Sequence, residues 1–355
     1  MKWGQVLKEA VAKQITPGGV ACVASGNGLG KRLSDAQGHL ALDSRACPVD
    51  ETTIYDLASL TKLLATTPLT ARALVDGLLQ LDECPWPAWP HVSIEQILTH
   101  TSGLIAWHPF YEEAIRRKVV GLPAGRNVVL ESVMATKPEH SPNSSAVYSD
   151  LGFIALGALL EERYQERLDH LTTTFWEEAI GDHSLRFISL FEQGYHPDIH
   201  RVAPTEHCSW RLRYIRGQVH DDNCFAMGGI AGHAGLFGAV SDVERAGRYL
   251  LSCIKAPANA LEETLHAFAT ASGQRPLGFD KADPEGSTGG ALSAKAVGHL
   301  GFTGTSLWID AGSTCHPDGM IYVLLTNRVY QSRNKKDIFE VRQAFHREAV
   351  DAFQE

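Results

Sequence analysis

Long apolar runs, clusters of basic residues and closely paired cysteines are all missing from this chain of 355 residues. No apolar stretch approaches the ~20 residues that a membrane-spanning helix needs. Residues 1–10 carry charges where a signal peptide needs an apolar segment. Lys and Arg number 32 against 41 Asp and Glu, a net charge of −9, so we expect neither nucleic acid nor an anionic membrane as a partner. These absences predict a cytoplasmic protein that acts on a small molecule.

Disulfide and zinc frameworks are also unsupported. The seven cysteines are scattered, form no C-x-x-C pair and are odd in number, so reduced thiols are expected. The sequence shows no internal repeat and no low-complexity tract. What the chain does have is an apolar content of 44%, which at this length suffices for one large domain or for two lobes that share a cleft.

The order of the apolar patterns predicts strands near both ends of the chain and helices between them. Strands are expected at 20–24, 38–42, 297–304, 305–310 and 321–327. The last two are joined by a loop that ends in Asp318-Gly319, as in an antiparallel hairpin. A helix kinked by Pro68 is expected over 59–81, a proline-rich connector at 84–90, and further helices from Ser93 and over 110–118, 127–136, 150–168, 172–181, 241–254 and 335–353.

These patterns predict an α/β fold of the α+β type. Residues 1–90 and 221–355 are expected to form one lobe, an antiparallel sheet flanked by helices. Residues 91–220 are expected to form a second, mainly helical lobe, with a catalytic cleft between the two.

Ser59-Leu60-Thr61-Lys62 places a hydroxyl and an amine three residues apart at the start of a predicted helix. On a helix this spacing brings both side chains to one face, where the amine can take the proton of the hydroxyl. The helix N-terminus favours the negative charge that develops in acyl transfer. The stretch fits the S-x-x-K motif of serine acyl-transfer enzymes, but four residues also match by chance, so other parts of the chain have to support it.

Two distant stretches supply the partners that such a nucleophile needs. Tyr148 and Asp150 offer a phenol and a carboxylate in a loop that leads into an apolar helix. Residues 298–304, Gly-His-Leu-Gly-Phe-Thr-Gly, form a strand whose glycines let the backbone approach a ligand and point an N–H group at an oxyanion.

With Ser59-x-x-Lys62, Tyr148-Ser149-Asp150 and His299-Leu300-Gly301 in this order, the chain resembles the serine β-lactamase-like superfamily. That superfamily contains class C β-lactamases, D-alanyl-D-alanine carboxypeptidases and related esterases. The second and third stretches stand at its Y-x-N and K-T-G positions. Residues 97–104, 232–237 and 325–328 add support, so the resemblance covers most of the chain.

The resemblance implies a β-lactamase/transpeptidase-like fold and a role for each residue. Ser59 would attack a carbonyl, Lys62 and Tyr148 would share the roles of general base and acid, and the N–H groups of Ser59 and Phe302 would form the oxyanion hole. The substrate would be bound by Asp150, His299 and Gly301. No cofactor is implied.

Two positions depart from the superfamily's commonest residues. Asp150 stands where Asn usually donates and accepts hydrogen bonds, and an ionised carboxylate cannot donate. His299 replaces a lysine and removes a permanent cation that would attract a substrate carboxylate, since histidine is half charged only near its ordinary pKa of ~6.5. We therefore expect weak β-lactam hydrolysis at most.

Structural roles are the alternative for several of these residues. Asp150 is equally well explained as the N-cap of the helix that follows. His299 also fits a residue that hydrogen-bonds within the sheet. We interpret His233 as orienting a turn between glycines and His100 as fastening a loop.

The segment 204–223 is polar and aromatic, as loops near a cleft tend to be, although a packed surface loop has the same composition. Together with His196 and His200 it raises the question of a metal site. The spacings match no established zinc pattern and the serine mechanism needs no metal, so none is predicted.

The predicted function is that of a serine hydrolase that forms an acyl-enzyme with an ester or amide, of the esterase or D-alanyl peptidase type. Its substrate would be a small ester, a peptide or a muropeptide. A function of another class stays open, that of a non-hydrolytic, penicillin-binding-like sensor that keeps the pocket without turnover. Asp150 is the residue that favours this alternative.

Overall fold

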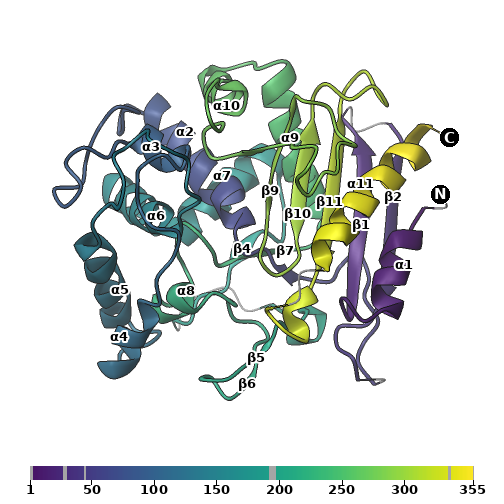
Figure 1. The fold of residues 1–355 in the computed structure, drawn as a ribbon, viewed down its shortest axis with the longest axis horizontal. Coiled ribbons are helices and arrows are strands. Elements are labelled where there is room, and N and C mark those ends of the chain that lie inside the picture. The colour runs from purple at the N-terminus through teal and green to yellow at the C-terminus, as the bar shows by residue number, and fades with distance from the viewer. Residues whose placement is uncertain (1–2, 27–29, 44, 192–196, 335–336, 355) are drawn as a thin grey trace.

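The computed structural model describes residues 3–26, 30–43, 45–191, 197–334 and 337–354. An antiparallel sheet with helices on both faces occupies one side of the molecule, and a group of helices occupies the other (Figure 1). The predicted fold class is confirmed by this architecture.

The main sheet joins the two ends of the chain. β1 (Gly18–Ser25) pairs antiparallel with β2 (Arg32–Gly38) on one side and with β11 (Met320–Thr326) on the other. β10 and β11 form the predicted antiparallel pair. In the described part of the chain the strand order is β2-β1-β11-β10-β9-β8, where the last three are β10 (Ser306–Asp310), β9 (Ala296–Leu300) and β8 (Asp280–Lys281).

Alternating side chains anchor the sheet in two separate cores. On β1, Val20 points into one core and Val23 into the other, as the period of two in a strand requires. α9 (Val240–Lys255) covers the first face, while α1 (Gln5–Ala12) and α11 (Ile338–Gln354) lie together on the second. Because both faces are covered, β1 is buried along its whole length and its sequence is an apolar run.

The helical side contains most of the middle of the chain. Ser93 starts its helix with a capping box, in which its Oγ accepts a hydrogen bond from Gln96 N and its own N–H donates to Gln96 Oε1. Within the described ranges, every helix is too short or too polar to cross a membrane. In the described part of the chain, the helices besides α1, α9 and α11 are α2 (Thr67–Val75), α3 (Ile94–Leu98), α4 (Tyr111–Arg116), α5 (Pro123–Ala135), α6 (Asp150–Tyr164), α7 (Leu168–Ile180), α8 (Asp222–Ala226) and α10 (Ala260–Thr270), with 3₁₀ turns η2 (Ile199–Arg201) and η3 (Arg328–Tyr330).

Two small sheets complete the fold of the described residues. β3 (Tyr55–Asp56), β7 (Leu236–Gly238) and β4 (Arg186–Phe187) form one of them. β5 (His207–Cys208) and β6 (Arg213–Tyr214) form a separate hairpin. The sequence did not predict these strands, because two or three residues are too few to show a period of two.

Three predicted elements are wrong in detail. The strand expected at 297–304 ends at Leu300, and residues 301–304 form the turn into β10. The strand expected at 38–42 lies instead at β2, an edge strand of exposed and half-buried residues that lacks an apolar run. The helix expected over 59–81 is a π-helical turn, η1 (Lys62–Thr66), followed by α2, and Pro68 sits in the first turn of α2, where its missing N–H is tolerated. The lobe boundaries at residues 90 and 220 stay a prediction.

Candidate active site

Ser59 lies on a tight turn between β3 and η1, and the surrounding structure fixes its backbone. The preceding Ala58 has a φ of +49°, a left-handed conformation that costs a non-glycine residue about 1–3 kcal/mol. The Ala58 N–H donates to Asp56 Oδ1 at 2.8 Å, and the Thr303 hydroxyl donates to the Asp56 carbonyl at 2.7 Å. The turn that carries Ser59 is therefore tied to the segment between β9 and β10.

Lys62 is fully buried, and oxygen atoms surround its ammonium group. Its Nζ donates to Tyr148 Oη and to Asp150 Oδ1, both at 2.6 Å. Ser59 Oγ lies at 3.1 Å and the His233 carbonyl at 3.4 Å. An ammonium has three N–H donors and no acceptor, so this shell of acceptors suits the charged form.

The charges around Lys62 decide its protonation. Burial on its own lowers the pKa of Lys62, but the Asp150 carboxylate and the Tyr148 oxygen raise it, and the balance lies above the ordinary lysine value. Lys62 is therefore a cation at neutral pH and cannot accept a proton from Ser59 in that state.

Tyr148 is held beside Lys62 by His100. The His100 Nδ1 accepts a hydrogen bond from Ser149 N at 3.1 Å, and the rings of His100 and Tyr148 lie 4.6 Å apart. These contacts agree with the interpretation of His100 as a residue that fastens a loop. Burial raises the pKa of the Tyr148 phenol above its ordinary value, while the Lys62 charge and hydrogen bonds from Lys62 and Ser59 act in the opposite direction.

His299 lies at the end of β9, with its ring centroid 5.9 Å from that of Tyr148. Its Nδ1 is hydrogen-bonded to the Leu300 carbonyl at 2.8 Å. Burial, together with the Lys62 cation, lowers the pKa of His299 to about 3. The side chain is therefore neutral at neutral pH, and the partial charge expected from its ordinary pKa is not present.

Gly301 lets the end of β9 approach the nucleophile turn. A Cβ on this residue would meet the Thr305 hydroxyl and lie 2.6 Å from the Leu57 carbonyl oxygen. Thr305 Oγ1 donates to the same carbonyl at 3.0 Å. A side chain at position 301 would push the strand away from the turn that carries Ser59.

The backbone N–H groups of Ser59 and Phe302 are available to bind an oxyanion. Among the described residues, neither N–H donates to a protein acceptor. Phe302 is 49% exposed, and its ring stacks on His220 with centroids 5.6 Å apart. Unbonded amides beside a nucleophile are suited to a developing negative charge.

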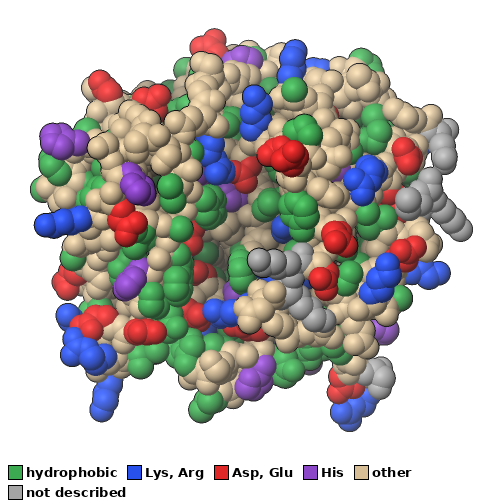
Figure 2. Space-filling view, in the orientation of Figure 1, with side chains coloured by type: hydrophobic (Ala, Val, Ile, Leu, Met, Phe, Trp, Pro, Cys, Tyr) green, Lys and Arg blue, Asp and Glu red, His purple; other side chains and the backbone are tan. Residues whose placement is uncertain are grey.

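One cavity of about 660 Å³ brings these residues together. Figure 2 shows the hollow between the helices on the left and the sheet on the right, with acidic, basic and histidine side chains inside it. The polar segment 204–223 reaches this cavity with residues 220–222. The seven residues predicted for the site all line the cavity or bond to its lining: Ser59, Lys62, Tyr148, Asp150, His299, Gly301 and Phe302.

Comparison with known proteins identifies the family. Residues 3–345 match the family model described as Beta-lactamase. The chain belongs to the Beta-lactamase family. A putative D-alanyl-D-alanine carboxypeptidase from Escherichia coli (strain K12) is 28% identical over 319 residues, which span 79% of this chain and 71% of that protein.

Solved structures share the fold at low sequence identity. EstCE1, a hydrolase with promiscuous acyltransferase activity, has a TM-score of 0.72 at 17% identity, over 99% of this chain and 97% of that one. Simvastatin synthase (LovD) from Aspergillus terreus has a TM-score of 0.71 at 17% identity, over 99% and 98%. A beta-lactamase from Mycobacterium bovis has a TM-score of 0.62 at 18% identity, over 98% and 99%.

In this member of the Beta-lactamase family, Asp150 does not cap the helix that follows it. Ser149 is the N-cap residue of α6 and Asp150 is the first helical residue. The Asp150 N–H donates to the Ala106 carbonyl at 2.9 Å, and its carboxylate binds Lys62. The acid at the Y-x-N position is therefore a counter-ion for Lys62.

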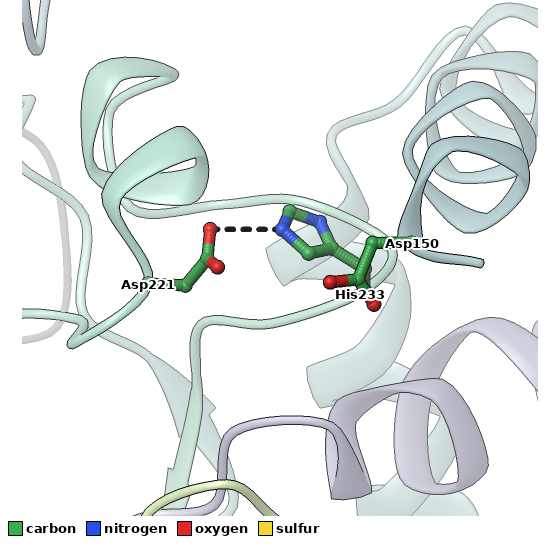
Figure 3. A group of neighbouring side chains, drawn as sticks. All are labelled: Asp150, Asp221 and His233. Atoms are coloured by element: carbon green, nitrogen blue, oxygen red, sulfur yellow. Dashed lines mark hydrogen bonds and ion pairs between the residues drawn. The ribbon is translucent and has the colours of Figure 1, made fainter. Parts of the chain in front are cut away.

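Asp221 and His233 form a second pair that the sequence did not predict, in which His233 is buried and Asp221 is half-buried. His233 Nε2 and Asp221 Oδ1 are 2.9 Å apart, and Figure 3 shows the two side chains facing each other with Asp150 nearby. The Gly-His-Ala-Gly stretch at 232–235 was the available signal, but it was interpreted as a turn alone. The His233 carbonyl accepts a hydrogen bond from Lys62, and the interpretation of His233 as orienting a turn stays a prediction.

Among the described residues, these three side chains form a group that could hold a metal ion. Ligand atoms of Asp150, Asp221 and His233 all lie within 4.8 Å of one another. In the structure, Asp150 binds Lys62 and Asp221 binds His233. Of the histidines that raised the metal question, His200 is exposed and His196 lies outside the described residues.

Arginines of the cavity were also missed. Arg342, on α11, donates to the carbonyls of Gly301 and Thr305, both at 2.8 Å, and burial lowers its pKa to about 9. Arg275 pairs with Asp280. Neither residue belongs to a recognisable motif. The apolar pattern of α11 predicted a helix but not the role of Arg342.

Proposed function

We propose that this protein is a serine hydrolase in which Ser59 forms an acyl-enzyme with an ester or amide. The observation that carries the proposal is the position of Lys62 Nζ, which contacts Ser59 Oγ at 3.1 Å and Tyr148 Oη at 2.6 Å beside a cavity. A nucleophile, a proton-handling group and two unbonded amides are what acyl transfer needs. Family membership and relatives named as carboxypeptidases support the same class.

In this mechanism the Ser59 proton passes to Tyr148. Lys62 donates to Ser59 Oγ and is held as a cation by Asp150, so the Ser59 hydrogen is directed to another acceptor. Tyr148 in its phenolate form takes that proton while Oγ bonds to the carbonyl carbon, and the Lys62 cation stabilises the phenolate. Tyr148 then gives the proton to the leaving alcohol or amine as its bond to the carbonyl carbon breaks.

Hydrolysis of the acyl-enzyme uses the same groups in reverse. Tyr148 takes a proton from water as the water oxygen bonds to the acyl carbon, and it returns the proton to Ser59 Oγ as the acyl bond breaks. In both steps the amides of Ser59 and Phe302 would bind the negative oxygen.

The cavity supports both candidate substrate classes. Trp107 and Phe302 line it and are 43% and 49% exposed, so they offer apolar surface to the acyl or alkyl group of an ester. Arg342 lines it as well, and among the described residues its hydrogen bonds go to carbonyls rather than to acids. That uncompensated cation would attract the C-terminal carboxylate of a D-alanyl peptide.

Turnover measurements test this proposal. Wild type and Ser59→Ala are assayed with short-chain nitrophenyl esters and with D-Ala-D-Ala peptides. We expect the wild type to hydrolyse at least one class, and the variant to lose about 10³-fold or more in kcat. Equal rates for the two proteins would remove Ser59 from the mechanism.

A second candidate is a non-hydrolytic, penicillin-binding-like sensor that keeps the pocket without turnover. Its support is the resting charge state, in which Asp150 holds Lys62 protonated and burial keeps Tyr148 a neutral phenol, so no strong base is ready at neutral pH. Such a protein would release at most one equivalent of nitrophenol. Continued release beyond one equivalent excludes it.

A further inference from the structure

A second cavity, of about 600 Å³, lies beside the first. It is built by the β5–β6 hairpin, the segment 209–210 that follows β5, and residues 330–333 after β11. Asp222 and Arg333 line both cavities, so the two share a wall. None of the residues proposed above for acyl transfer lines the second cavity.

Two stacked pairs of aromatic rings form part of the lining of this second cavity. Tyr111 stacks on Trp210 with centroids 5.4 Å apart and planes 19° from parallel. Tyr214 stacks on Tyr330 with centroids 4.8 Å apart and planes 13° from parallel. Stacking fixes the orientation of each ring, and Tyr214 is still 49% exposed. Rigid aromatic faces of this kind suit a ligand that itself has a flat apolar face.

The charges of the second cavity are already paired. Glu206 binds Arg333, and Asp222 binds Arg211 at 2.7 Å and Arg333 at 3.4 Å. A cationic ligand would have to displace an arginine from its carboxylate, and an anionic ligand would have to displace a carboxylate from its arginine. A neutral ligand needs neither exchange, because a paired carboxylate keeps lone pairs that accept hydrogen bonds from hydroxyl groups.

We propose that this cavity binds a neutral, polyhydroxylated ligand, a pyranose sugar. The apolar face of the sugar ring would stack on Tyr214 and Trp210, and its hydroxyls would bond to Glu206 and Asp222. The shared wall places the sugar next to Ser59's cavity. If Ser59 is the nucleophile of the proposed function, on which this inference rests, then the substrate is an ester or amide that carries a sugar.

Binding is measured without turnover, on the Ser59→Ala protein. Saturation-transfer NMR with cellobiose reports direct contact, and tetramethylammonium serves as the cationic comparison probe. We expect cellobiose to bind and Tyr214→Ala and Trp210→Ala, each in the Ser59→Ala background, to weaken it about tenfold. Leu212→Ala is the matched control, because Leu212 lies on the same hairpin, is 80% exposed and does not line the cavity.

Each outcome decides one point. No binding of cellobiose, or equal binding by the aromatic variants and the Leu212 control, overturns the sugar site, as does binding of tetramethylammonium in its place. Labelling of Ser59 by a fluorophosphonate, measured in proteins that keep Ser59, separates this inference from the proposed function. Labelling without sugar binding removes only the sugar site, and sugar binding without labelling removes only the hydrolase. Unchanged labelling of Tyr214→Ala confirms that this variant is folded.

Discussion

The buried ion pair between Lys62 and Asp150 sets the charge state of the candidate site. The Lys62 side chain is fully buried and that of Asp150 is 16% exposed. Because little water reaches the two charges, each is stabilised mainly by the other. The pair keeps Lys62 positive, and through its own charge Asp150 also raises the pKa of Tyr148. The Asp150 carboxylate therefore opposes proton loss from both Lys62 and Tyr148.

Replacing Asp150 by asparagine is expected to shift the pH profile of kcat/KM. In the wild type the pKa values of Lys62 and Tyr148 are both raised, so the rate increases with pH on the alkaline side as the base loses its proton. Asp150→Asn removes the negative charge and lowers both pKa values. The rising limb should move to lower pH by about one unit or more.

The control for this shift is Asp82→Asn, which removes a carboxylate from an exposed position. Its profile should match that of the wild type. An Asp150→Asn profile that keeps the wild-type midpoint would mean that Asp150 does not control the proton-handling groups. Loss of all activity is resolved by labelling with a fluorophosphonate at several pH values, which reports the same titration.

At the scale of elements, the candidate site depends on how closely β9 approaches the turn after β3. Gly301 is the point of contact, because a Cβ there would meet Thr305 and the Leu57 carbonyl. Gly301→Ala should therefore separate Phe302 N from Ser59 N, lower kcat/KM by about 10²-fold and destabilise the fold by about 1–3 kcal/mol. Assays and thermal unfolding on the same samples measure both effects.

Gly77→Ala is the control for a glycine-to-alanine change away from the candidate site. Gly77 has a φ of +71° but nothing within 4 Å of a Cβ, so alanine there costs about 1 kcal/mol of backbone strain without touching the site. Its kcat/KM should stay at the wild-type value. A Gly301→Ala protein that keeps full activity would contradict the close approach of strand and turn.

Elements with a strong local pattern were predictable, and the others were not. β1 is an apolar run because both of its faces are covered, while β2 is an edge strand whose mixed sequence hides its position. The Ser59-x-x-Lys62 spacing is local, so its contact forms within one turn of the chain, in which the Lys62 N–H donates to the Ser59 carbonyl. The pair of Asp221 and His233 and the position of Arg342 depend on tertiary packing between distant segments, for which one sequence carries no pattern.

At the scale of the whole molecule, buried histidines make stability depend on pH. His299 and His346 are buried and have pKa values of about 3, below the ordinary value of ~6.5. Between these values the unfolded chain binds protons that the folded protein does not bind. Stability is therefore complete above about pH 6.5 and falls as the pH drops towards 3, by up to ~1.4 kcal/mol per pH unit for each histidine.

His346→Asn tests this dependence away from the candidate site. His346 Nδ1 is hydrogen-bonded to the Ser287 carbonyl at 3.2 Å, and an asparagine amide can keep that bond without titrating. Urea midpoints at pH 7.5 and 5.0 should differ less for the variant than for the wild type. His200→Asn, at an exposed position, should behave as the wild type. An unchanged difference in His346→Asn would show that this histidine is not buried in its neutral form.

The most direct test of the central claim is the intact mass of the protein after reaction with a fluorophosphonate and, separately, with a penicillin. If Ser59 is the nucleophile activated by Lys62 and Tyr148, the wild type gains one stable fluorophosphonate adduct and Ser59→Ala gains none. The penicillin adduct, if it forms, should also require Ser59. An adduct of equal yield on the Ser59→Ala variant, or no adduct with either reagent on the wild type, would contradict the account.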